Sequence, residues 1–169
     1  MDRLERLLDP ASAARRDALI EQARAVYRDA EFDAADAAAV LIANAQARAS
    51  EARDVEEARV SELELPAREA ETRVKRAARG AEREELLAQL EELGSWYRDL
   101  VAVAVGAGSA AVHLDKLSLL EEDATRERLN GAERAAEAAR ESWRALEEFN
   151  LAPQLALESL FLRVSRELT

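Results

Sequence analysis

The sequence predicts an all-α protein, a six-helix bundle from which a long antiparallel helical hairpin protrudes. Two observations on composition support this class: the 169 residues include only five glycines and three prolines, and aromatic residues make up 4% of the chain. Alanine, leucine, glutamate and arginine, which favour helices, dominate instead. The third observation is that apolar residues recur at three- and four-residue intervals, whereas no alternating strand pattern bounded by turn residues is found. A chain of this length suits one domain.

Charge and cysteine content narrow the classes of function. The net charge of −11 predicts repulsion from nucleic acid and from anionic membranes, unless the chain carries a separate basic patch. No cysteine is present, so disulfides and thiolate sites are excluded. The first residues lack the apolar core of a signal peptide, and the nearly uncharged run 100–114 is too short to span a bilayer. We therefore expect a cytoplasmic protein without membrane contacts or direct nucleic-acid binding.

The strongest helical pattern runs from Leu86 to Val105 and organises the rest of the chain. Its apolar residues occupy one face at the start of the helix and almost the whole circumference at its end. We expect the last three turns of this helix to form the centre of the molecule. Arg98 and Asp99 lie within this apolar run, and both need partners if they are buried.

The helices before this stretch are delimited by capping residues and prolines. Residues 1–9 form a short amphipathic segment, and Asp9 with Pro10 predicts the start of a helix that ends near Asp29. Asp33 can cap a second helix. Pro66 is costly inside a helix but tolerated in a first turn, which predicts a turn over residues 63–66. A third helix then begins near Ala67 and continues into the central stretch.

Residues from about 50 to 80 are predicted to project from the bundle as a charged arm. The apolar stripe narrows there to small residues, which allow two helices to pack closely: Ala52, Val55 and Ala58 before the turn, and Ala70, Val74, Ala77, Ala78 and Ala81 after it. Charged flanks are typical of a solvated helical surface, although a partner-binding tip is an alternative.

Three further segments complete the bundle. Gly106 and Gly108 are expected to end the central helix. Asp115 can cap a short helix, and Asn130 with Glu133 has the spacing of a capping box that opens a fifth helix with Trp143 on its inner face. The last helix begins at Pro153, and one of its faces is apolar enough to pack against the central helix through Leu157, Leu160, Phe161, Val164 and Leu168.

The sequence offers no catalytic or metal-binding constellation. His113 is the only histidine, and we interpret it as an ordinary loop residue. The glycine-containing segment Gly106-Ala107-Gly108-Ser109 follows a helix rather than a strand and lacks the lysine of a phosphate-binding loop. We therefore interpret this segment as the end of the helix. No acid and base pair stands out among the glutamates. We predict a protein that is not an enzyme and uses neither a cofactor nor a metal.

Three motifs resemble the C-terminal region of the bacterial clamp-loader delta-prime subunit of DNA polymerase III, in its actinobacterial type. Trp96-Tyr97-Arg98-Asp99-Leu100 looks like that family's tryptophan-tyrosine-arginine-aspartate motif. His113-Leu114-Asp115 is similar to the asparagine-x-aspartate that follows, with histidine as a departure. The segment 149–163 is similar to the family's last helix and its asparagine-valine-asparagine-proline start, where Ala152 replaces the second asparagine.

The resemblance implies a collar domain over residues 10–169, preceded at 1–9 by a remnant of an ATPase lid helix, with the arm as an insertion. Such collars are expected to associate with the collars of the delta and tau/gamma subunits, which holds the pentameric sliding-clamp loader together during DNA replication. The ATPase module that supplies an arginine finger is not part of this sequence. A stand-alone helical-bundle scaffold or a ligand-binding protein is the alternative.

The resemblance also marks residues that belong either to the core of this bundle or to a subunit interface. Aromatic and leucine side chains bury large areas in both settings, so residue type does not distinguish them. For Arg98, Asp99 and Glu158 we hypothesise a local network, in which the arginine bridges carboxylates or the aspartate caps a neighbouring helix. The marked residues are Trp96, Tyr97, Arg98, Asp99, Asp115, Trp143, Asn150, Leu157, Glu158, Leu160 and Phe161.

Overall fold

The chain is all-helical in the computed structural model, which describes residues 10–63, 65–149 and 151–169. The predicted class and the six α-helices are confirmed over these ranges, and no strand occurs within them. The predicted lid-helix remnant at 1–9, the Asp9 cap and Asn150 lie outside the described residues. The elements are α2 (Pro10–Arg28), α3 (Ala34–Glu62), α4 (Ala67–Ala104), the short 3-10 helices η1 (Gly108–Ala110) and η2 (Leu114–Lys116), α5 (Leu117–Asp123), α6 (Leu129–Phe149) and α7 (Pro153–Leu168).

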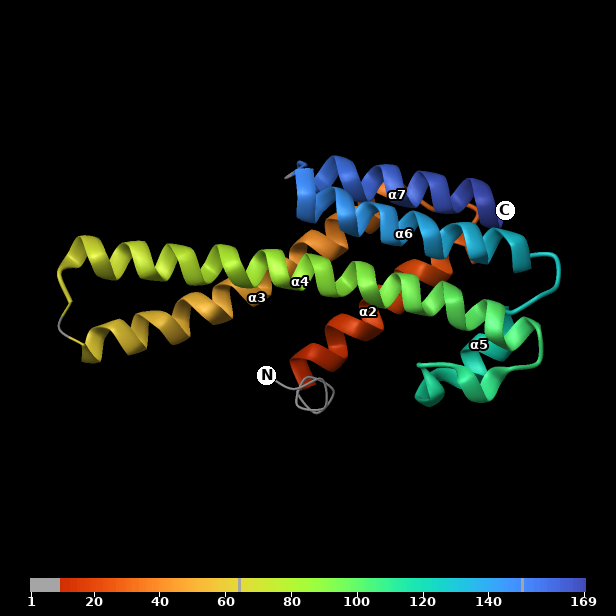
Figure 1. The fold of residues 1–169 in the computed structure, drawn as a ribbon, viewed down its shortest axis with the longest axis horizontal. Coiled ribbons are helices and arrows are strands. Elements are labelled where there is room, and N and C mark those ends of the chain that lie inside the picture. The colour runs from red at the N-terminus through yellow and green to blue at the C-terminus, as the bar shows by residue number, and fades with distance from the viewer. Residues whose placement is uncertain (1–9, 64, 150) are drawn as a thin grey trace.

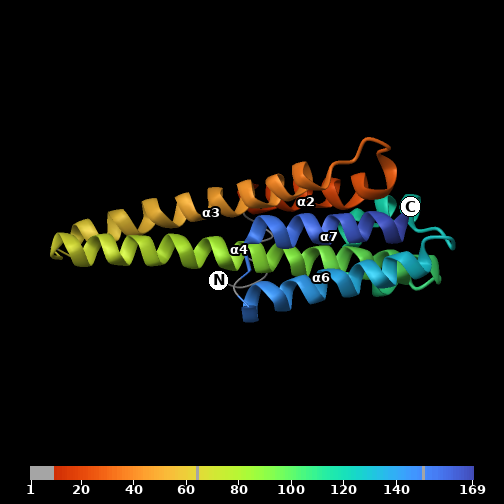
Figure 2. The same ribbon diagram turned by 90° about the horizontal axis from the view of Figure 1, so that it is seen from above.

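Helix α4 is the axis of the molecule. Its 38 residues span about 57 Å. Apart from α3, the helices that pack on its bundle end are no longer than roughly half of this. Helix α3 runs antiparallel beside it, and the hairpin of α6 and α7 packs on α4 and α3 (Figures 1 and 2). The distal halves of α3 and α4 continue past the other helices and form the arm, seen at the left of Figure 1.

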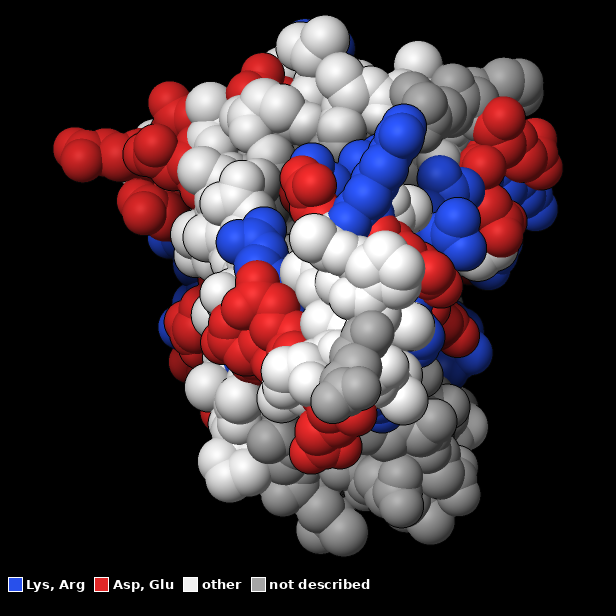
Figure 3. Space-filling view, turned by 90° about the vertical axis from the view of Figure 1, so that its left-hand side faces the viewer, with Lys and Arg blue, Asp and Glu red and all other residues white. Residues whose placement is uncertain are grey.

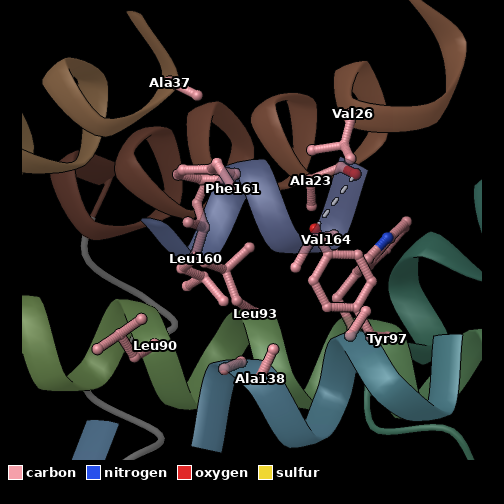
Figure 4. Packing of buried hydrophobic residues seen from close by; sticks show 14 of the residues in the cluster. Ala23, Val26, Ala37, Leu90, Leu93, Tyr97, Ala138, Leu160, Phe161 and Val164 are labelled. Atoms are coloured by element: carbon pink, nitrogen blue, oxygen red, sulfur yellow. Dashed lines mark hydrogen bonds between the residues drawn. The ribbon is translucent and has the colours of Figure 1, made fainter. Parts of the chain in front are cut away.

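The core lies where α2, α3, α4, α6 and α7 converge. Leu90, Leu93 and Tyr97 of α4 point into it, and Leu160 and Phe161 approach from α7 (Figure 4). Alanines on α6 keep that helix close to α4, as the buried set shows: Ala132, Ala135, Ala138 and Ala139. We expected α7 to pack on the central helix. Its main backbone neighbours are instead α6 and α3, and its side chains meet those of α4 within the core.

The C-terminal end of α4 is only partly buried. Trp96, Tyr97 and Leu100 are fully enclosed as predicted, but the residues of the last turn are half-buried and Val105 is 61% exposed. The expectation that all three last turns form the centre is therefore wrong for the final one. Gly106 stops the helix with φ of +83°, and the amides of Gly106 and Ala107 donate to the carbonyls of Val103 and Ala102. This pattern is a Schellman motif, which explains why glycine ends the helix.

The arm is packed around the predicted stripe of α4, where Ala78 and Ala81 are buried, but around a buried carboxylate on the α3 side. Val55 is 60% exposed and Ala58 is exposed, so that part of the stripe is wrong. Glu56 lies in the seam instead, where it accepts hydrogen bonds from Arg59 at 3.1 Å and Arg73 at 3.1 Å. Because the two arginines compensate the charge of Glu56, this carboxylate can be buried in the seam. Apolar spacing alone assigns the buried positions to its neighbours.

Of the four predicted caps, three lie within the described residues, and two of these three differ from the structure. Asp33 caps α3 as expected, accepting from the amides of Ala35 at 2.7 Å and Asp36 at 3.2 Å. Asp115 lies inside η2 and pairs with Arg16 of α2, so it caps no helix. Helix α6 begins at Leu129, one residue before Asn130, so Asn130 is within the helix rather than at its cap.

Alanine substitutions at two helical glycines are expected to change the stability of the protein in opposite directions. Replacing Gly80 of α4 with alanine meets nothing within 4 Å and is expected to stabilise the protein by about 0.5–1 kcal/mol, because glycine weakens a helix interior. At Gly131 of α6, an added Cβ would lie 2.1 Å from the Glu167 carbonyl oxygen. Gly131→Ala is therefore expected to destabilise by about 1–3 kcal/mol. Urea unfolding followed by circular dichroism measures both, and similar effects at the two sites would contradict the packing described.

Candidate functional site

A buried aspartate of the tryptophan-tyrosine-arginine-aspartate motif joins α4 to the loop that follows it. The side chain of Asp99 is fully buried, and its Oδ2 accepts hydrogen bonds from the backbone amides of Val112 at 2.8 Å and His113 at 2.9 Å. The same oxygen lies 2.7 Å from Nδ1 of His113. Three contacts on one carboxylate oxygen fix the loop before η2 against the central helix.

His113 lies between two carboxylates of α4. Its Nε2 is 2.9 Å from Oε1 of Glu92, and its ring meets Trp96 edge to face, with centroids 5.4 Å apart. Burial lowers the pKa of His113, but the hydrogen bonds and charges of Glu92 and Asp99 outweigh it, so that its pKa is raised above the ordinary 6.5. The ring is 1% exposed, so the prediction of an ordinary loop residue is wrong.

The raised pKa of His113 predicts that its contribution to stability depends on pH. The stabilisation is fully present below pH 6.5, where the ring is charged in both states, and is lost as the pH rises through the folded pKa. The difference in unfolding free energy between the wild type and His113→Gln should therefore be largest near about pH 6 and smaller near about pH 9. Urea titrations at the two pH values measure it. A difference that is constant or grows with pH would contradict the charged state assigned to the ring.

A second buried carboxylate joins α5 to α2. Asp123 is 2% exposed and accepts from Nε of Arg24 at 2.6 Å and from the hydroxyl of Tyr27 at 2.8 Å. Arg28 adds a contact at 3.0 Å, and the guanidinium of Arg128 lies 5.0 Å above the Tyr27 ring. The hydrogen bond to Asp123 raises the pKa of Arg24, and burial raises the pKa of the Tyr27 hydroxyl. Both side chains therefore keep the protonation state that the contacts require.

Together the two carboxylates hold the connection between α4 and α6. Asp99 fixes its beginning and Asp123 fixes the end of α5, although most of the intervening residues contribute little to the core. Neither cluster presents an unengaged nucleophile beside its acidic and basic groups. Within the described ranges, no three metal-binding side chains gather closely enough to hold an ion. The contacts of the two carboxylates therefore fix the connection between α4 and α6 against α4 and α2.

A groove of about 610 Å³ lies between α2, α4 and the His113 loop. Both of its arginines are engaged with carboxylates: Arg15 lies 3.5 Å from Glu85, and Arg16 pairs with Asp115. The inner wall is formed by Glu92 and His113. A ligand in this groove would have to compete with these internal ion pairs.

The structure places most of the motif residues in the core rather than on the surface. The buried ones are Trp96, Tyr97, Asp99, Leu157, Leu160 and Phe161, while Trp143 packs on the core half-buried.

The hypothesised network of Arg98, Asp99 and Glu158 exists only in part. Asp99 accepts from the two amides just before η2 and so fixes this loop rather than capping a helix. Arg98 has a side chain 57% exposed and lies 3.6 Å from Oδ1 of Asp99. Glu158 accepts from Gln154 of its own helix and is not part of this contact, so the three-residue network is wrong.

The sequence did not single out Arg24, Glu92 or Asp123, and it led us to interpret His113 as an ordinary loop residue. The burial of Arg24 could have been inferred from the sequence, because this residue lies between Ile20 and Tyr27 on the apolar face of α2. A charge at such a position requires a buried partner. The loop around His113 has no helical period, so nothing in its spacing indicates burial.

Two leucines on the outer face of α7 and one just before the helix are left uncovered. Leu155 and Leu162 are seven residues apart and are 68% and 51% exposed, and Leu151, which precedes Leu155 by four residues, is 50% exposed. A spacing of seven places Leu155 and Leu162 on one side of the helix, whereas Leu151 precedes α7, which begins at Pro153. The opposite side carries Leu157, Leu160 and Phe161 into the core. Helix α7 therefore buries one apolar face, and it exposes two further leucines on the opposite side, in a sector that also holds Ser159 and Arg166.

No protein family, curated protein or solved structure matches this chain. Across the residues that the structure describes, none of the helices combines the length and the apolarity needed to cross a bilayer.

Proposed function

We propose that this chain is the collar domain of a DNA polymerase III clamp-loader delta-prime subunit, a non-catalytic module that holds the pentameric clamp loader together. The resemblance of the Trp96–Leu100 motif and of the last helix supports the family. The observation that carries the role is the pair of exposed leucines on the outer side of α7, Leu155 and Leu162, with exposed Leu151 just before the helix. Exposed apolar residues aligned on one side of a helix are typical of an interface with another helical protein.

The rest of the fold suits a rigid partner surface. The core fixes α7 against α3 and α6, and the Asp99 and Asp123 contacts immobilise the connection between α4 and α6. A surface that is already ordered loses little conformational entropy on binding, which favours affinity. The partners are the helical collars of the delta and tau/gamma subunits in the cytoplasm, and neither a cofactor nor catalysis is required of this domain.

Size-exclusion chromatography with light scattering tests the proposal. The chain is run alone and then mixed with the delta and tau/gamma subunits of the same organism. We expect a monomer alone and a defined complex in the mixture. A folded chain that does not associate with these subunits, also when their ATPase modules are present, would overturn the proposal. A stable dimer of the isolated chain would instead favour the stand-alone scaffold.

A ligand-binding function is the weaker candidate. The groove beside His113 has the volume for a small molecule, but its arginines and histidine are already paired with carboxylates. Binding sites for small molecules usually combine apolar walls with a few unengaged polar groups. The uncovered face of α7 thus favours a protein partner over a small ligand.

A further inference from the structure

The arm carries a basic stripe, which we define as Arg68, Arg76 and Arg79 of α4. At 3.6 residues per turn, these three positions fall within about 80° of one another around the helix axis. Thr72 and Arg83 share this sector, and no acidic residue between positions 68 and 83 falls into it. All three arginines are exposed. In a protein with a net charge of −11, this is a local concentration of positive charge.

The arginines of the basic stripe differ from their neighbours in having no ion pair with any described residue. On the same helix, Arg73 contacts Glu56 at 3.1 Å, Lys75 pairs with Glu71, and Arg83 donates to the carbonyl of Glu147 at 2.7 Å. Because these neighbouring cations have partners, the positive charge without a partner lies on the face of the basic stripe. Figure 3, which views the molecule toward the tip of the arm, shows Lys and Arg side chains to the right of the centre with acidic side chains among them, and further acidic side chains at the left.

Charge is also segregated between the two helices of the arm. Residues 50–62 of α3 contain five acidic and two basic side chains, whereas residues 67–79 of α4 contain five basic and two acidic ones. The first segment thus has a net charge of −3 and the second of +3. An anionic partner is therefore attracted to the α4 side of the arm and repelled from the α3 side, which orients it.

We propose that the basic stripe binds the phosphate backbone of nucleic acid. The guanidinium groups of arginine match phosphate oxygens in a bidentate geometry. From Arg68 to Arg79 the helix rises about 16 Å, and a duplex strand presents a phosphate every ~3.4 Å along its axis, so the stripe spans about five phosphates. The stripe contains no large apolar side chain, which favours a polyanion over the anchor residues of a protein partner.

This inference does not depend on the clamp-loader proposal, and it changes the expectation drawn from composition. The net charge predicted no direct nucleic-acid contact unless a separate basic patch existed, and the arm supplies such a patch at a distance from the acidic bundle. The contacts are with phosphates alone, so the binding is independent of base sequence and sensitive to salt.

Fluorescence anisotropy with a labelled duplex DNA of about 20 base pairs at about 50 mM salt tests the proposal on the full chain. The test variant is Arg68→Gln, Arg76→Gln and Arg79→Gln combined. The matched control combines Arg126→Gln, Arg144→Gln and Arg166→Gln, which removes the same charge from exposed positions outside the arm. Circular dichroism melting confirms that both variants are folded.

We expect the wild type to bind and the test variant to lose at least about ten-fold in affinity, while the control stays within about three-fold. The slope of log K against log salt should become shallower by about 2–3 in the test variant, because each lost phosphate contact contributes about 0.9. The proposal is overturned if the wild type shows no binding at ~100 μM DNA, the weak end of non-specific affinities, or if both variants lose affinity equally. It is likewise overturned if poly-glutamate binds as tightly as DNA, because the partner would then be an acidic polypeptide.

Discussion

Replacing Asp99 with alanine is expected to destabilise the protein by about 3–5 kcal/mol. The substitution removes the acceptor of two backbone amides and of the His113 ring, all of which lie at 2.7–2.9 Å from one carboxylate oxygen. Buried donors without an acceptor cost their full desolvation penalty, and the charged ring would lose its nearest counter-charge. Urea unfolding at pH 6, where the ring is charged, measures the effect.

The neighbouring residue provides the control for this prediction. Arg98 is exposed and touches only the edge of Asp99, so Arg98→Ala should change stability by less than about 1 kcal/mol. Asp99→Asn keeps one oxygen acceptor but loses the charge, and it should fall between the two. If Arg98→Ala cost as much as Asp99→Ala, the arginine rather than the loop amides would be the main partner of the carboxylate.

Asp123→Ala is expected to have an effect of similar size, again about 3–5 kcal/mol. It leaves Arg24, which is 8% exposed, without its buried counter-charge and removes the acceptor of the Tyr27 hydroxyl. Glu122 is the matched control, because it contacts the same two arginines, Arg24 and Arg28, from the surface. Glu122→Ala should cost less than about 1 kcal/mol in the same urea assay.

A double substitution separates the two possible origins of this loss. Arg24→Met combined with Asp123→Leu removes both charges and keeps side-chain volume, so it should be less destabilising than Asp123→Ala alone. An equal or larger loss in the double variant would mean that packing around α5, rather than the uncompensated arginine, accounts for the effect.

The helices were predictable because the apolar spacing and the terminating residues agree. Asp33, Pro66 and Gly106 each act where local chemistry allows one outcome: a side-chain cap, a missing amide, or a positive φ. Within α4 the spacing of Leu86, Leu90, Leu93, Tyr97 and Leu100 identifies the buried face, and all five are buried. Where leucines also lie outside the buried face, as in α7, spacing alone does not tell which of them the chain covers.

The buried polar contacts could not be predicted, because they join residues that are distant in sequence. Asp99 signalled the need for a partner, but the partners are loop residues 112 and 113, which no period marks. Asp123 reaches Arg24 across 99 positions. Glu56 shows the reverse case, in which a charge replaces an apolar residue in a helical seam because two arginines satisfy it. Such contacts depend on tertiary placement rather than on local propensity.

The most direct test of the collar assignment is the affinity of the chain for the assembled delta and tau/gamma subunits, with and without the uncovered face of α7. Leu155→Glu combined with Leu162→Glu places two charges on that face. Val55→Glu with Leu63→Glu, two exposed apolar residues of α3 and its end, is the matched control. We predict a loss of at least about 100-fold for the α7 variant, or about 2.7 kcal/mol, and less than about three-fold for the control. Wild-type affinity in the α7 variant would contradict the assignment of this face as the interface.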